Sequence, residues 1–143
     1  MDNLISLLGF AAQQGIEVDW FSMKRAESLS MPLPDGKFGI AIDPEKVQSD
    51  ADEFCKLIHE VGHCVTGAFY NRYSSFDLRE KHEHRADRWA IEQRITENDL
   101  DDAVAEGCTE LWQLADYFSV TEDFMKKAVC YYTHGNLAAE LYF

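Results

Sequence analysis

The sequence is sparing with cysteine, and no two of its cysteines lie close together. There are four, widely spaced, and none forms a C-x-x-C pair. Zinc sites built on thiolates need such pairs, and small secreted domains stapled by disulfides show regular cysteine spacings. The sequence therefore argues against both arrangements and favours buried free thiols. The residues concerned are Cys55, Cys64, Cys108 and Cys130.

Basic residues are scarce as well. The chain has 13 lysines and arginines against 26 aspartates and glutamates, which gives a formal net charge of −13. DNA, RNA and anionic membranes are themselves negatively charged, so we do not expect direct binding to nucleic acid. The charge favours a basic protein surface or a basic peptide as the partner.

Long hydrophobic runs are the third absence. No stretch reaches the roughly 18 apolar residues that read as a membrane span. The start of the chain, Met1 to Leu8, also lacks the basic residues and the cleavage site of a secretory signal. We therefore expect a cytoplasmic protein with no membrane partner. Hydrophobic residues still make up 46% of the chain, which is enough for a core. The length of 143 residues is typical of one domain, so we expect a single domain over 1–143.

The hydrophobic pattern changes along the chain from strand-like to helical. Three short segments after a first helix are typical of strands, with a helical turn expected at 22–28 and Pro32 suited to a sheet edge or a strand end. Beyond residue 45 the apolar residues recur at helical spacing. We predict an α+β fold in which a small N-terminal antiparallel sheet packs on a mostly helical body. The expected strands are 16–21, 29–33 and 38–42, and the expected helices are 2–14, 47–68, 78–95, 97–106, 109–118 and 121–132, followed by a tail at 133–143.

One predicted helix carries the pattern H-E-x-x-H, as His59-Glu60-Val61-Gly62-His63. Histidines four residues apart lie on one face of a helix, so both can bind the same metal ion. On a helix this pattern is the signature of zinc metalloproteases, with the glutamate as general base. We therefore predict Zn²⁺ bound by His59 and His63, with Glu60 as the catalytic residue. Gly62 is unfavourable inside a helix and predicts the close approach of another backbone, for which the sheet is a candidate.

A catalytic zinc ion needs a third protein ligand, and Glu83 is the best candidate. It follows His63 by 20 residues, which fits a loop and a reversal into an antiparallel helix. Asp87 lies one turn further on the same face, where it could accept a hydrogen bond from the outer ring nitrogen of a liganding histidine. Asp87 or His84 could also replace Glu83 as the ligand. Removing the Glu60 carboxylate should abolish turnover and leave the metal in place.

These two segments resemble the ImmA/IrrE family of zinc metallopeptidases. The resemblance rests on His59 to His63 and on Glu83-His84-Arg85-Ala86-Asp87-Arg88-Trp89-Ala90, which matches E-x-x-A-[N/D]-x-[F/W]-A. It implies a zincin-like domain of phage or mobile-element type, with His59, His63 and Glu83 as zinc ligands and Glu60 as the base. It also implies a protein substrate, a helix-turn-helix repressor. Some members of the family carry their own DNA-binding domain, for which this chain has no room.

Two other functions remain open at this point. The protein could be a binding module that sequesters a repressor without cutting it. It could instead bind DNA through residues 111–128, which have the look of a helix-turn-helix but open the second helix with Glu122 and Asp123. An edge strand at 29–33 or 38–42 could receive an extended substrate.

Several further residues near the motifs have more than one possible role. His82 and His84 point away from the Glu83 face and are expected to be exposed or packed, and Cys64 is expected to be a buried thiol. Five residues are candidate hydrogen-bond donors to a reacting carbonyl, among which the sequence does not choose. They are Tyr70, Tyr73, Tyr131, Tyr132 and His134.

Overall fold

A computed structural model describes residues 1–71, 73–135 and 137 of the chain. In these residues a three-stranded sheet precedes most of the helices, so the fold is α+β as predicted. Most of the predicted tail, 136 and 138–143, lies outside the described residues. The elements are α1 (Leu4–Gln13), β1 (Ile16–Trp20), β2 (Ser28–Pro32), β3 (Phe38–Ile42), a 3₁₀ turn (Pro44–Lys46), α2 (Asp50–Thr66), α3 (Phe76–Arg94), α4 (Glu97–Ala105), α5 (Leu111–Phe118) and α6 (Glu122–His134).

The sheet is mixed, so the prediction of an antiparallel sheet was wrong. Its strand order is β1-β3-β2, with β1 parallel and β2 antiparallel to the central strand β3. A tight turn with Gly36 at φ 82° joins β2 to β3. The chain between β1 and β3 is long enough for the crossover that a parallel pair of strands needs. This connection contains β2, which pairs on the other side of β3. Phe38–Ile42 is therefore the centre of the sheet. Of the two edge strands, β2 is the one that packs against α2, and it ends at Pro32 as expected.

The helical turn predicted at 22–28 does not form. The buried carboxylate of Asp43 accepts a hydrogen bond from the backbone nitrogen of Met23 at 2.9 Å, and Lys46 Nζ donates to the carbonyls of Met23 and Ala26. These contacts from the 3₁₀ turn satisfy backbone groups that a helix would pair internally, so the segment stays irregular. The 3₁₀ turn at Pro44–Lys46 was not predicted; the Asp43 side chain caps it by accepting a hydrogen bond from the Glu45 backbone nitrogen.

The six main helices agree with their predicted ranges to within three residues at either end. Local caps explain the boundaries. The Ser75 side chain accepts a hydrogen bond from the Leu78 backbone nitrogen and begins α3. Thr96 and Asp99 cap each other at the start of α4. Such caps satisfy backbone groups within a few residues of the chain, so the sequence displays them directly.

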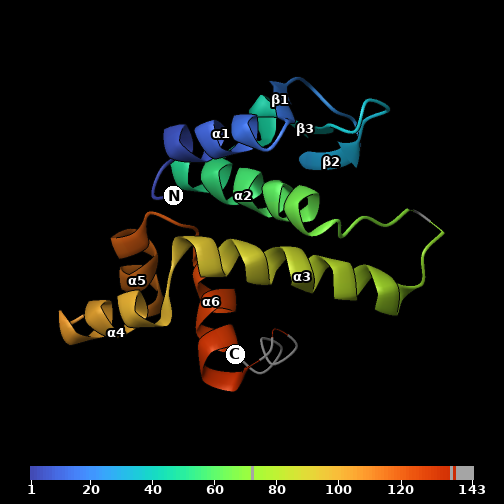
Figure 1. The fold of residues 1–143 in the computed structure, drawn as a ribbon. Coiled ribbons are helices and arrows are strands. Elements are labelled where there is room, and N and C mark those ends of the chain that lie inside the picture. The colour runs from blue at the N-terminus through green and yellow to red at the C-terminus, as the bar shows by residue number, and fades with distance from the viewer. Residues whose placement is uncertain (72, 136, 138–143) are drawn as a thin grey trace.

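Helix α2 lies in the middle of the molecule, between the sheet with α1 on one side and α3 on the other (Figure 1). Leu57, Ile58 and Val61 of α2 are fully buried in the core between these layers. The connection after α2 reverses the chain, so α3 runs back antiparallel beside it, and α6 crosses the far part of α3. Both predicted metal-binding segments therefore lie on adjoining helices.

Gly62 contacts α3 and not the sheet, which corrects the candidate given by the sequence. A Cβ atom built on Gly62 would lie 2.7 Å from the backbone oxygen of Ala86 and 3.2 Å from its Cα. Two helices come this close only where both residues are small. The close approach brings the α3 side chains on either side of Ala86 up to the histidines of α2.

Candidate metal centre

Both histidines are fixed by the way α2 is built. The Ser49 side chain accepts a hydrogen bond from the Asp52 backbone nitrogen and begins the helix, and Gly67 ends it at φ 68°. The apolar stripe of α2 faces the core, which sets the rotation of the helix and turns His59 and His63 towards α3. Their side chains are 23% and 6% exposed, so both rings are held within the protein.

The inner nitrogens of the two histidines face each other. Nε2 of His59 and Nε2 of His63 lie 3.1 Å apart, and the ring planes meet at 86°. The Glu83 carboxylate from α3 completes the group, with Oε2 at 2.7 Å from His59 Nε2 and Oε1 at 3.2 Å from His63 Nε2. One ligand atom from each of the three residues lies within 4.8 Å of the other two. The three predicted ligands are thus brought together, and the group could hold a metal ion.

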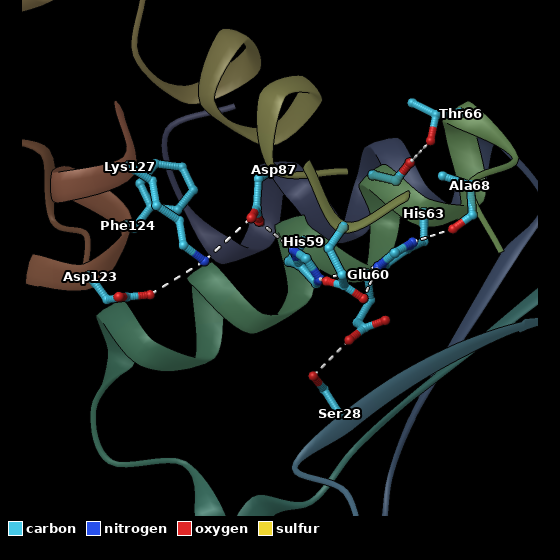
Figure 2. Close-up of polar contacts among 12 residues, drawn as sticks. Ser28, His59, Glu60, His63, Thr66, Ala68, Asp87, Asp123, Phe124 and Lys127 are labelled. Carbon is cyan, nitrogen blue, oxygen red and sulfur yellow. Dashed lines mark hydrogen bonds and ion pairs between the residues drawn. The ribbon is translucent and has the colours of Figure 1, made fainter. Parts of the chain in front are cut away.

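The outer ring nitrogens show which lone pairs are free to bind a cation. His63 Nδ1 lies 2.5 Å from the carbonyl oxygen of Ala68, and His59 Nδ1 lies 2.6 Å from Oδ1 of Asp87 (Figure 2). A carbonyl and a carboxylate only accept, so each Nδ1 carries the proton. With the proton on Nδ1, each Nε2 would offer its lone pair to a cation beside the Glu83 carboxylate. Three acceptors that converge in this way fit a bound cation.

The charges of the group are consistent with a positive centre. Burial lowers the pKa of His59, but hydrogen bonds with Asp87 and Glu83 outweigh it and raise that pKa to about 10. Burial raises the pKa of Glu83, yet hydrogen bonds from His59 and His63 hold it far below its ordinary value. Without a metal ion, a proton on His59 therefore takes the cation's place between the three acceptors.

Glu60 comes from the same helix and faces the sheet. Its side chain is almost fully buried, and Oε2 accepts a hydrogen bond from Ser28 Oγ of β2 at 2.8 Å (Figure 2). Glu60, His63 and Glu83 line one cleft of about 240 Å³, together with β2 residues Ser28 to Ser30. The predicted base thus shares a cleft with two of the three possible ligands, on the side where β2 forms a wall.

Tyr70 is the residue near the site that the sequence could not single out. Its hydroxyl donates to Glu83 Oε1 at 2.6 Å, and its ring lies 6.3 Å from that of His63. Burial and the bond to Glu83 raise its pKa to about 12, so the hydroxyl keeps its proton. Of the other candidate donors, Tyr131 bonds to Glu92, and Tyr132 bonds to the carbonyl of Ile95. Tyr70 differs from the other candidates in lying just after the turn that ends α2. This position can be recognised only once the fold is known.

The remaining candidates lie outside the group of three ligands. Asp87 contacts the outer nitrogen of His59, as expected, and not the inner one. His82 stacks on Tyr70, with ring centroids 6.4 Å apart, and His84 lines a separate cleft on α3. Cys64 is buried, and burial raises its thiol pKa to about 12. Tyr73 is 80% exposed.

Among the described residues, no helix combines the length and the apolar character needed to cross a bilayer. A scan against protein-family models gives no match to this chain, and a search of curated proteins gives none either.

Proposed function

We propose that the protein is a zinc-dependent endopeptidase. The observation that carries the proposal is the convergence of His59, His63 and Glu83 beside a cleft that Glu60 also faces. Two imidazoles and one carboxylate are a donor set of catalytic zinc sites, which leave a fourth position for water or substrate. The proposal agrees with the resemblance to the ImmA/IrrE family. It also gives a use to the buried Glu60, which is not part of the ligand group.

Each residue then has a chemical task. A zinc ion held there would polarise a peptide carbonyl and make a water molecule more acidic. The Glu60 carboxylate accepts the proton of the attacking water and delivers it to the departing amine. Ser28 donates to the Glu60 oxygen Oε2 and fixes the direction of the carboxylate. The Tyr70 hydroxyl holds Glu83 through a hydrogen bond at 2.6 Å.

The proposed substrate is an extended or locally unfolded segment of a basic protein. Strand β2 ends the sheet on the side of the cleft, and Ser28, Leu29 and Ser30 line its wall. An extended segment could pair with such a strand and pass its backbone in front of Glu60. The net charge of −13 favours a positively charged partner, as a helix-turn-helix repressor of a phage or mobile element would be.

The test uses a small basic helix-turn-helix protein encoded next to this gene as the candidate substrate. Zinc-loaded wild-type protein and the Glu60→Gln variant are each incubated with it, and fragments are identified by mass spectrometry. We expect cleavage with the wild type and a loss of about 10²- to 10⁴-fold in rate for Glu60→Gln. Both should bind the same amount of zinc. The matched control is Glu80→Gln, since Glu80 is an exposed residue of α3, and its rate should match that of the wild type.

Two outcomes would contradict the proposal. A wild-type protein that binds no divalent metal after reconstitution has no metal centre. If wild type and Glu60→Gln hold the repressor equally and leave it uncut, the protein is a binding module. A gel shift at physiological salt separately tests residues 111–128, and we expect no DNA binding.

A further inference from the structure

A lysine from a third helix reaches the polar contacts behind the proposed metal ligands. Lys127 Nζ of α6 lies 3.3 Å from Oδ2 of Asp87, and Oδ1 of the same carboxylate lies 2.6 Å from His59 Nδ1. In Figure 2 dashed lines join the Asp87 carboxylate to the lysine on one side and to the imidazole on the other. The contact joins residues 59, 87 and 127, which are far apart in the sequence.

The position of Lys127 is fixed by the packing of α6. Thr121, which caps the helix, directs its backbone nitrogen and its hydroxyl at Cys55 Sγ of α2, at 3.5 and 3.7 Å. Phe124 and Ala128, on either side of Lys127 in sequence, are buried against the core. The lysine side chain is 27% exposed, so most of its stem lies against protein. Its ammonium group is therefore held at Asp87 by more than the ion pair.

Asp87 needs such a partner because it is a charged group with little access to water. Its side chain is 13% exposed. One of its oxygens faces His59 Nδ1 and the other faces Lys127 Nζ. A buried carboxylate with one oxygen on His59 and none on a cation would be free to turn about its χ2 angle. Two partners on different oxygens fix its plane, and the plane of the carboxylate fixes the imidazole.

We propose that Lys127 is a positioning residue of the metal centre, which acts through Asp87 on the orientation and the tautomer of His59. The inference rests on the metal-binding part of the proposed function. Partners of this kind behind a liganding histidine affect metal affinity by about 10- to 100-fold. Lys127 stands one contact further out than Asp87, so the lower end of that range applies.

The charge of Lys127 would by itself oppose a cation, but this effect is the smaller one. The ammonium group contacts the Asp87 oxygen that does not face the ring, and it also contacts Asp123 at 3.6 Å. The carboxylates of Asp87 and Asp123 therefore offset the positive charge of Lys127. The side chain is also partly exposed, so solvent screens the charge that is left. Loss of orientation should outweigh loss of repulsion, so removing Lys127 should weaken metal binding.

The experiment measures zinc affinity by competition with a chromophoric chelator, with the full-length protein. Lys127→Met should bind zinc about tenfold more weakly than the wild type. Lys127→Arg keeps a cation at Asp87 and should restore affinity to within about threefold. Lys126→Met removes the same charge from the neighbouring position, which points about 100° away around α6, and should change affinity less than twofold.

A second measurement separates positioning from general stability. In long-range ¹H–¹⁵N spectra of the zinc-bound protein, the Nδ1 proton of His59 should be visible in the wild type and in Lys127→Arg. In Lys127→Met it should be lost to faster exchange with water. Thermal unfolding is recorded alongside, and affinities are compared at a temperature where every variant is folded. If Lys127→Met fails to fold, Lys127→Gln is used in its place.

The outcomes are distinguishable from a failure of the proposed function. If the wild type binds no zinc, the metal centre itself is wrong. If the wild type binds zinc and Lys127→Met binds it equally well or more tightly, the inference is overturned, even if that variant unfolds at a lower temperature. A drop of equal size in Lys127→Met and Lys126→Met would point to a general disturbance of α6, not to the contact with Asp87, and would also overturn the inference.

Discussion

Two pairs of helices in this molecule are held together in opposite ways. Helices α2 and α3 meet at the close approach of Gly62 to Ala86 and carry between them the polar group of His59, His63 and Glu83. Helices α5 and α6 meet through buried apolar side chains, among them Leu114 and Phe124. Between α2 and α3, hydrogen-bond acceptors face one another and repel unless a cation lies between them. Between α5 and α6, the burial of apolar surface favours the contact without any further group. The comparison indicates that the α2–α3 contact carries the chemistry as well as stability, whereas the α5–α6 contact contributes stability alone.

The largest expected effect is on the close approach. In Gly62→Ala the new Cβ meets backbone atoms of Ala86, which cannot move without the helix, so α2 and α3 must separate. We expect a loss of about 3 kcal/mol in unfolding free energy and a strong loss of zinc binding, measured by denaturant titration and chelator competition. The control is Gly9→Ala in α1, where a Cβ has no neighbour within 4 Å. That variant should gain about 0.5–1 kcal/mol.

The next prediction concerns the apolar pair. Leu114→Ala in α5 removes a side chain that is 6% exposed and should lower the unfolding free energy by about 2 kcal/mol. Zinc affinity of the folded protein should stay within about twofold, because the lost contacts do not touch the ligands. Comparable losses of affinity in Leu114→Ala and Gly62→Ala would contradict the separation of stability from chemistry.

A pH titration of the metal-free protein tests how far the α2–α3 pair depends on a positive centre. The pKa of His59 is raised from 6.5 to about 10 in the folded state. A group with a raised pKa stabilises the fold fully below its unfolded pKa and loses that contribution as pH rises towards the folded value. Stability should therefore fall between about pH 6.5 and about pH 10, by at most about 1.4 kcal/mol per pH unit. Saturating zinc or His59→Gln should remove this part of the pH dependence.

The smallest expected effect compares two tyrosines. Tyr70→Phe removes the hydroxyl that donates to Glu83. Tyr132→Phe removes a hydroxyl that donates to the backbone carbonyl of Ile95, at the end of α3. We expect about three- to fivefold weaker zinc binding for Tyr70→Phe and no change for Tyr132→Phe. Equal affinities for both variants and the wild type would show that Glu83 needs no support from Tyr70.

Local features allowed much of the structure to be predicted. The helices have their start signals within a few residues of their first turn, as Ser49 and Thr96 show. The i, i+4 spacing of His59 and His63 places them together on any helix. Glu83 and Asp87 follow one another on the next helix in the same way. These predictions depend on the helical repeat and on short-range hydrogen bonds.

The errors all concern segments whose partners are distant in the chain. The sheet was expected to be antiparallel because neighbouring strands usually pair, but the crossover puts β3 beside both β1 and β2. The helical turn predicted at 22–28 does not form, because Asp43 and Lys46, about 20 residues further on, bind backbone groups of this segment. Gly62 was assigned to the sheet, although its neighbour is a backbone atom of α3. The periodic pattern of hydrophobic residues along the sequence does not reveal such long-range contacts.

The sequence by itself determined the helices, the spacing of the histidines and the acidic surface, because each depends on residue type and on neighbours within about one turn. Only the tertiary structure decided that Glu83 meets both inner nitrogens, that Tyr70 and not Tyr132 reaches Glu83, and that Lys127 stands behind Asp87. Those contacts join different elements, so they follow from how α2, α3 and α6 pack and from nothing that a single segment carries.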